Sequence, residues 1–306
     1  MSSTDARPNG RTLHGVSVPG TGRISLALVA FALGVSGVVV ATDGVVFSPP
    51  AAPQATVALA PVASTGCAAA GPYVPPEMGS VGLPPSLRLC PAGPLTISVP
   101  GTVVDGMDLR GGVVVDAADV VIRRSRITGD GSAPFGIVTT DAGSVRIEDT
   151  TLTGRFAEAA VGGSRWTAER IEIVGVTGDG AHVGEGSRLR ASLLSRFAPG
   201  ADVDGLELLA PDVVVEDTTV RMDEGHRSAV LLAPQGDGAG HGAGPIVVRS
   251  NILGGGEYTV HQPAGPAEDV HVVENRFARD AGRAPLRVPP AAESTGNTFV
   301  DGAPVR

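Results

Sequence analysis

The feature that most constrains the fold of this chain is a repeated sequence pattern. The octapeptide VRIEDTTL begins at Val145, and the similar VVVEDTTV begins at Val213, 68 positions later. Both fit an aliphatic residue, two free positions, a small hydrogen-bonding residue, one free position and another apolar residue. Seven copies, flanked by weaker copies at Val104 and Ser294, begin at Ile122, Ile147, Ile171, Leu189, Val215, Val248 and Val272. The 18- to 33-residue steps between these starts indicate a solenoid with insertions of variable length.

The pattern also indicates which secondary structure repeats. β-branched residues dominate the apolar positions, which favours pleated strands over pairs of helices. Apolar residues alternate and then change phase once, so each strand is predicted to bend at the small polar residue. We expect an inward ladder of hydrogen bonds along the stack at this bend, formed by Ser125, Thr150, Ser192, Thr218, Asn251 and Asn275.

On these copies, the chain from Thr102 to Phe299 resembles the right-handed parallel β-helix proteins of the pectate-lyase-like superfamily. The resemblance implies an all-β, right-handed parallel β-helix solenoid of about nine coils. At a strand spacing of ~4.8 Å, nine coils would form a rod on the order of 40 Å long. Members of the superfamily include lyases, hydrolases, epimerases, phage tail proteins and non-catalytic surface proteins, so the fold alone does not fix the activity.

The N-terminal region predicts an extracytoplasmic location. An apolar, uncharged run at 24–42 follows a tail at 1–23 that carries Arg7, Arg11 and Arg23. It is long enough to cross a bilayer as an apolar helix, and the arginines predict that the tail stays in the cytoplasm. Two interpretations remain open, a retained transmembrane anchor and a signal sequence cleaved after Val39-Val40-Ala41. A Pro/Ala-rich linker and cap at 43–91 then lead to the β-helix domain at 92–306.

Charge and cysteine content narrow the possible partners. The chain has a net charge of −9 and no concentrated basic stripe, so we expect no nucleic-acid partner. Its two cysteines, Cys67 and Cys90, are predicted to form a disulfide outside the cytoplasm. The membrane is a partner through the apolar run only, and the β-helix domain is expected to be an elongated monomer.

Two segments depart from the repeat and carry the candidate catalytic residues. GDGAHVG at 178–184 and DVDGLEL at 202–208 place Asp179 25 residues before Asp204, and His182 25 residues before Glu207. Because 25 residues is one coil, these four side chains are predicted to lie on adjacent rungs of one face. A histidine with several carboxylates can supply a general acid and base.

The same segments predict a cation site and allow a plainer interpretation. Asp202, Asp204 and Glu207 would be the ligands of the candidate cofactor, Ca²⁺, and no other cofactor is expected. Asp-Gly is, however, also common turn chemistry, and it recurs at Asp130 and Asp237 without such partners.

Four further residues are candidates for substrate binding: His226, Arg227, Tyr258 and His261. Aromatic residues make up only 3% of the chain, so a ligand would be held mainly by hydrogen bonds and ions. We therefore expect an extracellular, acidic polysaccharide that the protein binds or acts on as a lyase or hydrolase. The alternative is a non-catalytic cell-surface scaffold or adhesion protein, and whether the chain is an enzyme stays open.

Overall fold

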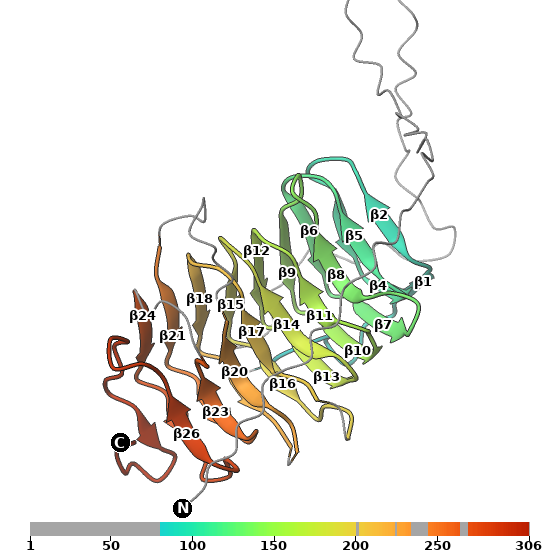
Figure 1. Cartoon of the computed structure of the whole chain (residues 1–306). Helices are drawn as coiled ribbons and strands as arrows, with labels where there is room; N and C mark the ends of the chain where they lie inside the picture. Colours follow the sequence, from blue (N-terminus) through green and yellow to red (C-terminus); the bar gives the residue numbers. More distant parts are fainter. Residues whose placement is uncertain (1–79, 200–201, 224, 234–243, 264–268, 306) are drawn as a thin grey trace, which may run out of the picture. The chain divides into compact units, whose positions relative to one another are not determined.

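The computed structural model describes residues 80–199, 202–223, 225–233, 244–263 and 269–305. These residues belong to the unit Val62–Arg306, and the other unit of the chain, Met1–Pro61, lies outside them. The described part is an all-β parallel solenoid without helix, in which successive turns lie side by side in sequence order (Figure 1). The strands form three parallel sheets, A, B and C, and the chain visits the sheets in that order in each turn.

Every described strand of the solenoid belongs to one of these sheets. Sheet A contains β1 (Cys90–Ala92), β4 (Met107–Arg110), β7 (Arg126–Asp130), β10 (Thr151–Arg155), β13 (Glu172–Val176), β16 (Leu193–Ser195), β19 (Thr219–Arg221), β22 (Ile252–Gly254), β25 (Arg276–Phe277) and β27 (Thr298–Phe299). Sheet B contains β2 (Leu95–Ile97), β5 (Val113–Val115), β8 (Phe135–Thr139), β11 (Ala159–Gly162), β14 (Asp179–Val183), β17 (Leu206–Leu208), β20 (Ser228–Leu232), β23 (Tyr258–His261) and β26 (Ala284–Arg287). Sheet C contains β3 (Val103–Asp105), β6 (Val120–Arg123), β9 (Val145–Glu148), β12 (Trp166–Glu169), β15 (Arg188–Arg190), β18 (Val213–Glu216), β21 (Ile246–Arg249) and β24 (Val270–Val273).

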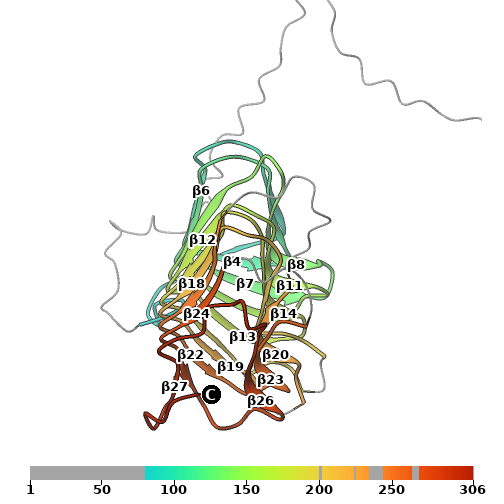
Figure 2. The same ribbon diagram turned by 60° about the vertical axis from the view of Figure 1, so that its left-hand side comes forward.

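The number of turns is smaller than the nine predicted coils. Sheet C has 8 strands, and the chain makes about 7 turns between the first and the last of them. Nine copies are separated by only eight steps, and the last copy, at Ser294, adds β27 to sheet A but no strand to sheet C. Figure 2 shows sheets B and C on opposite sides, with strands of sheet A between them. The inward side chains of all three sheets form one continuous apolar core, led by Trp166, Phe156 and Phe277.

The predicted bend is confirmed, and it has a backbone cause. The residue before each ladder position has a left-handed conformation, with φ from 47° at Arg124 to 57° at Glu274. At the two ends of the solenoid the same position is Gly106 or Gly296, both with φ 69°. A left-handed residue turns the chain sharply from sheet C into sheet A, which explains the single change of phase that the repeat shows.

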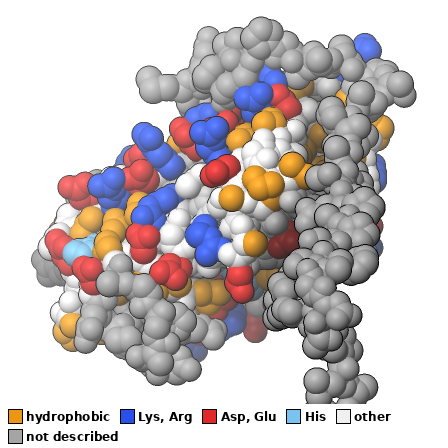
Figure 3. All heavy atoms as spheres, turned by 90° about the horizontal axis from the view of Figure 1, so that it is seen from above, with side chains coloured by type: hydrophobic (Ala, Val, Ile, Leu, Met, Phe, Trp, Pro, Cys, Tyr) orange, Lys and Arg blue, Asp and Glu red, His pale blue; other side chains and the backbone are white. Residues whose placement is uncertain are grey.

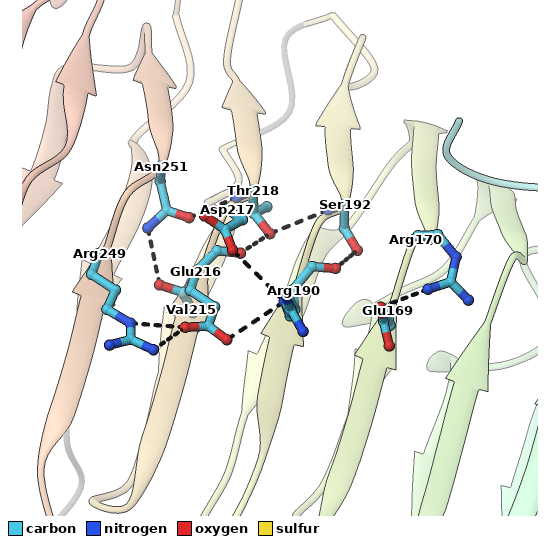
Figure 4. Close-up of polar contacts among 10 residues, drawn as sticks. All are labelled: Glu169, Arg170, Arg190, Ser192, Val215, Glu216, Asp217, Thr218, Arg249 and Asn251. Atoms are coloured by element: carbon cyan, nitrogen blue, oxygen red, sulfur yellow. Dashed lines mark hydrogen bonds and ion pairs between the residues drawn. The ribbon is translucent and has the colours of Figure 1, made fainter. Parts of the chain in front are cut away.

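The predicted ladder of hydrogen bonds forms at this bend (Figure 4). The Ser192 amide donates to Thr218 Oγ1 at 3.3 Å, and the Thr218 amide donates to Asn251 Oδ1 at 2.9 Å. The Asn251 amide then donates to Asn275 Oδ1 at 3.0 Å, and Asn297 continues the ladder beyond the predicted set. The side chains at these positions are buried, so the ladder satisfies polar groups that the core would otherwise leave unpaired.

One copy of the repeat was predicted in the wrong phase. The copy assigned to Ile171 begins three residues earlier, because Ala168 is the residue that pairs with Ile147 of the preceding turn. Ile171 itself therefore occupies the ladder position and is buried. The sequence misleads here because IEIVGV alternates apolar residues in either phase, and no serine, threonine or asparagine marks the bend.

The outer face of sheet C carries charged side chains that pair between rungs. Arg249 forms an ion pair with Glu216 of the preceding rung, and Arg190 lies 3.7 Å from both Glu216 and Asp217 (Figure 4). Figure 3 shows acidic and basic side chains interspersed across the face that it presents. Opposite charges on neighbouring rungs make favourable cross-strand pairs, so this regular charge pattern is explained by the stack itself.

Several predictions about the N-terminal part lie outside the described residues. Among the described ranges, no helix is long and apolar enough to cross a membrane. The apolar run at 24–42 and most of the linker are not in those ranges. Cys90 is buried and takes part in a disulfide, whereas Cys67 lies outside the described residues, so their pairing stays a prediction.

Candidate functional site

The four candidate catalytic residues come from adjacent strands of sheet B. His182 in β14 pairs in register with Glu207 in β17. Counting back three residues on each strand places Asp179 opposite Asp204, which immediately precedes β17. The 25-residue spacing therefore corresponds to one turn, as predicted. We call Asp179, His182, Asp204 and Glu207 the sheet B cluster.

His182 is the centre of the sheet B cluster. Its Nε2 lies 2.9 Å from Asp179 Oδ2 and 3.4 Å from Glu207 Oε2, so both carboxylates contact the same ring nitrogen. The Phe135 ring contacts the imidazole edge to face, with 5.6 Å between ring centroids. Gly162 leaves the space for that ring, because a Cβ at residue 162 would lie 2.5 Å from Phe135. Packing and two carboxylates thus fix the imidazole on the outer face of the sheet.

Asp204 is the most buried member of the cluster, with only 1% of its surface exposed. Its backbone amide donates to Asp179 Oδ1 at 2.9 Å, which joins the two aspartates of the matched pair. Arg227 Nε lies 3.7 Å from Asp204 Oδ2, which is too long for a strong hydrogen bond. The other oxygen, Oδ1, has no hydrogen-bond partner among the described residues.

Burial and mutual charge shift the pKa values of the cluster. Burial raises the pKa of Asp204 to about 7, against the opposing charge of Arg227 and with a smaller contribution from Asp179. Burial also raises the pKa of Glu207, which the His182 charge partly offsets. For His182, burial lowers the pKa, but the hydrogen bond and charge of Asp179 and the charge of Glu207 together raise it. The cluster therefore holds groups that can exchange protons near neutral pH.

The two Asp-Gly pairs of the cluster are not tight turns. Gly180 lies inside β14, and neither Gly180 nor Gly205 has the positive φ that would require glycine. Both glycines instead allow close packing, since a Cβ at residue 180 would lie 2.6 Å from Leu194. At residue 205 it would lie 2.6 Å from Val220. The glycines are thus explained by the packed interior, and turn chemistry does not account for the aspartates beside them.

The structure gathers a different set of possible metal ligands from the one predicted. Ligand atoms of Asp179, His182 and Glu207 all lie within 4.8 Å of one another. Of the predicted ligands, only Glu207 belongs to this group. The Asp202 side chain is 84% exposed and lies 3.8 Å from Arg227, and Asp204 is buried beside the group. Sequence spacing could not predict that Asp202 lies apart from this group, because Asp202 precedes the strand and has no register partner.

The candidate substrate-binding residues divide into buried and outward ones. His226 is buried, and its ring lies 6.0 Å from that of Phe197, so it is part of the interior and does not face a ligand at the surface. Arg227 points toward the sheet B cluster, as described above. Tyr258 and His261 lie together on β23, with 4.5 Å between their ring centroids.

Two arginines that sequence reasoning left without a role surround Tyr258. Arg287 donates to the Tyr258 hydroxyl at 2.7 Å, and its guanidinium carbon lies 5.1 Å from the ring centroid. The guanidinium carbon of Arg283 lies 5.8 Å from the same centroid. Burial, followed by the charge of Arg287, lowers the pKa of His261. The register of His261 with Arg287 could have identified this basic group if the boundaries of β26 had been known.

Two cavities of the described residues lie on other faces of the solenoid. A cavity of about 410 Å³ lies between segment 83–89 and the outer side of sheet A, where Asp108 and Arg126 line it. A smaller one of about 170 Å³ lies on sheet C between Arg146 and Glu216. Neither of these two cavities is lined by a residue of the sheet B cluster, whose Asp179, His182 and Glu207 side chains are partly exposed.

Comparisons of the chain with protein-family models, curated proteins and solved structures found no match. The resemblance to the pectate-lyase-like superfamily therefore stays an expectation from the sequence, and the structure itself shows a parallel β-solenoid.

Proposed function

We propose that this protein acts on an extracellular acidic polysaccharide, as a lyase or hydrolase, at the sheet B cluster. The observation that supports this most strongly is the buried Asp204 carboxyl beside three further ionisable side chains on one face. Burying a carboxyl group with an unpaired oxygen destabilises a fold, and such an arrangement is most readily explained by a functional site. The extracytoplasmic location rests on the apolar run at 24–42 and is part of the proposal.

The chemistry available to the cluster is proton transfer. In the proposed reaction, Asp204 delivers a proton to the glycosidic oxygen that leaves. Glu207, which is more exposed, accepts a proton from an attacking water in a hydrolase or from the sugar carbon in a lyase. His182 holds Glu207 and Asp179 in place through the contacts at Nε2. Asp179, His182 and Glu207 lie on strands and Asp204 immediately precedes one, so the solenoid positions the cluster rigidly.

The expected acidity of the substrate rests on the arginines of the same face. Arg227 lies next to the cluster, and Arg283 and Arg287 lie two to three rungs further along sheet B, around Tyr258. Guanidinium groups bind carboxylates through paired hydrogen bonds. A chain of carboxylated sugars that follows the sheet would therefore pass from the cluster to these arginines.

The proposal is tested with the full chain and a panel of acidic and neutral polysaccharides. We expect release of reducing ends, and for a lyase also of unsaturated products, from acidic polysaccharides only. Asp204→Asn should abolish the release. Asp217→Asn is the matched control, because Asp217 is an exposed carboxylate at the bend that follows β18. Equal activity of the two variants would refute the assignment of the site.

The second candidate function is a non-catalytic cell-surface scaffold. It is favoured by the two cavities described above, which lie on sheets A and C and are not lined by the sheet B cluster. A scaffold would bind the same polysaccharide without releasing products, so binding together with a failed product assay would support it over the enzyme.

A further inference from the structure

We propose that Asp179, His182 and Glu207 bind one divalent transition-metal ion of the zinc class. This inference goes beyond the proposed function and does not rest on it, since metal binding requires no substrate. The three ligand atoms come from two adjacent strands of a packed sheet, so their positions are set by the fold and not by a loop.

The distances within the group suit a small ion. Zn²⁺ binds nitrogen and oxygen ligands at about 2.0–2.2 Å, which places neighbouring ligand atoms about 2.8–3.6 Å apart in octahedral or tetrahedral geometry. His182 Nε2 lies 2.9 Å from Asp179 Oδ2 and 3.4 Å from Glu207 Oε2. All three ligand atoms lie within 4.8 Å of one another, so an ion that replaced the proton at Nε2 would lie within reach of both carboxylates.

A second histidine of the protein shows why the contacts of His182 are unusual. His271 also lies between two carboxylates, but its Nδ1 contacts Glu293 at 2.6 Å and its Nε2 contacts Asp269 at 2.8 Å. Carboxylates on opposite ring nitrogens cannot meet at one ion. At His182 both carboxylates converge on the same nitrogen, as ligands of a shared ion do.

Asp204 supplies an independent observation that points to a bound cation. It is only 1% exposed, it neighbours Asp179 on the next rung, and its Oδ1 has no hydrogen-bond partner among the described residues. Asp179 on the adjacent rung and Glu207 on the same rung carry charges of the same sign as the Asp204 carboxylate, so the three groups repel one another. A cation held by those two carboxylates would offset this repulsion between like charges.

The donor set favours a transition metal over Ca²⁺, the ion expected from the sequence. Ca²⁺ takes six to eight oxygen ligands, typically at about 2.3–2.6 Å. Here one of the three ligands is an imidazole nitrogen, which suits zinc, copper, iron or nickel. Three protein ligands would also leave a position open for water, as in catalytic zinc sites.

The test is a titration of the metal-free full chain with Zn²⁺, Co²⁺ and Ca²⁺, each alone, by calorimetry. We expect one equivalent of Zn²⁺ or Co²⁺ to bind, with a visible absorption band that reports nitrogen ligation of Co²⁺. His182→Gln should weaken binding by more than about 100-fold, because even changes beyond the ligands themselves typically weaken it 10- to 100-fold. His271→Gln is the matched control and should bind like the wild type.

Three outcomes would overturn the inference: no binding of Zn²⁺ or Co²⁺, selective binding of Ca²⁺, or an equal effect of the two histidine substitutions. If His182→Gln fails to fold, Glu207→Gln replaces it, since this change removes a ligand charge and keeps the shape of the side chain. Loss of polysaccharide activity plays no part in the readout, so failure of this inference and failure of the proposed function are distinguishable.

Discussion

His182 and Glu207 occupy the same position on adjacent rungs of sheet B, with 3.4 Å between Nε2 and Oε2. In a parallel stack, an outward side chain meets the residue one turn later as its nearest neighbour. A histidine and a glutamate one turn apart are therefore brought together by the fold itself, and Asp179 on the same strand as His182 completes the contact.

The first prediction concerns the ladder and the core at one bend. Thr218→Val removes the acceptor of the Ser192 amide and should lower the free energy of unfolding by roughly 1–2 kcal/mol. Val215→Asp places a carboxylate in a fully buried position and should cost several kcal/mol. Denaturant unfolding measures both variants. Equal destabilisation would show that the inward face of sheet C is assigned wrongly.

The second prediction concerns the glycine beside Asp179. Gly180→Ala should destabilise the protein by about 1–3 kcal/mol, because the added methyl group meets Leu194 and the backbone of the next rung. Gly93→Ala is the control, since a Cβ at residue 93 has no neighbour within 4 Å. A comparable loss at both positions would contradict the account of packing between rungs.

The third prediction concerns pH and the segment after β26. Hydrogen bonds that His271 donates to Asp269 and Glu293 raise the pKa of His271, and the His271 contact lowers the pKa of Glu293. The raised histidine pKa stabilises the fold below its unfolded pKa of about 6.5, and this contribution is lost as the pH rises through the folded value. The lowered glutamate pKa stabilises the fold above its unfolded pKa of about 4.3, and this stabilisation is lost as the pH falls through the folded value.

Stabilisation from this pair should therefore be greatest at about pH 4.3–6.5 and decline on either side. His271→Gln should flatten that part of the dependence of the melting temperature on pH. The pair bridges β24 and residue 293, so hydrogen exchange near Glu293 should rise in the variant. An unchanged pH profile would show that the contact contributes nothing to stability.

The repeat predicts the solenoid because stacked turns require the same bend at the same place. The predicted ladder residues between Ser125 and Asn275 are small and polar, so the ladder could be identified from the sequence alone. The phase of the copy at Ile171 could not be identified in this way, because the ladder residue there is apolar and no small polar residue marks the bend. The count of turns was too high because nine copies are separated by only eight steps, and the last copy adds no strand to sheet C.

The site was predictable only where register determines it. Asp179 with Asp204 and His182 with Glu207 follow from one turn of spacing. Asp202 lies before its strand, where the spacing does not predict which way a side chain points, and its side chain is exposed.

The residues around the cluster follow the same principle. His226 was predicted to bind substrate because it follows a bend, yet it packs inside against Phe197. Arg283 and Arg287 received no role because their strand carries no recognisable copy of the repeat pattern.

The central claim, that the sheet B cluster is functional and not required by the fold, is tested most directly by the double variant Asp204→Asn with Glu207→Gln. The melting temperature and the release of products from acidic polysaccharides are measured on the same preparation. The account predicts a melting temperature equal to or above that of the wild type, since like charges are removed, together with loss of activity. A raised melting temperature with undiminished activity would contradict it, as would unfolding of the variant.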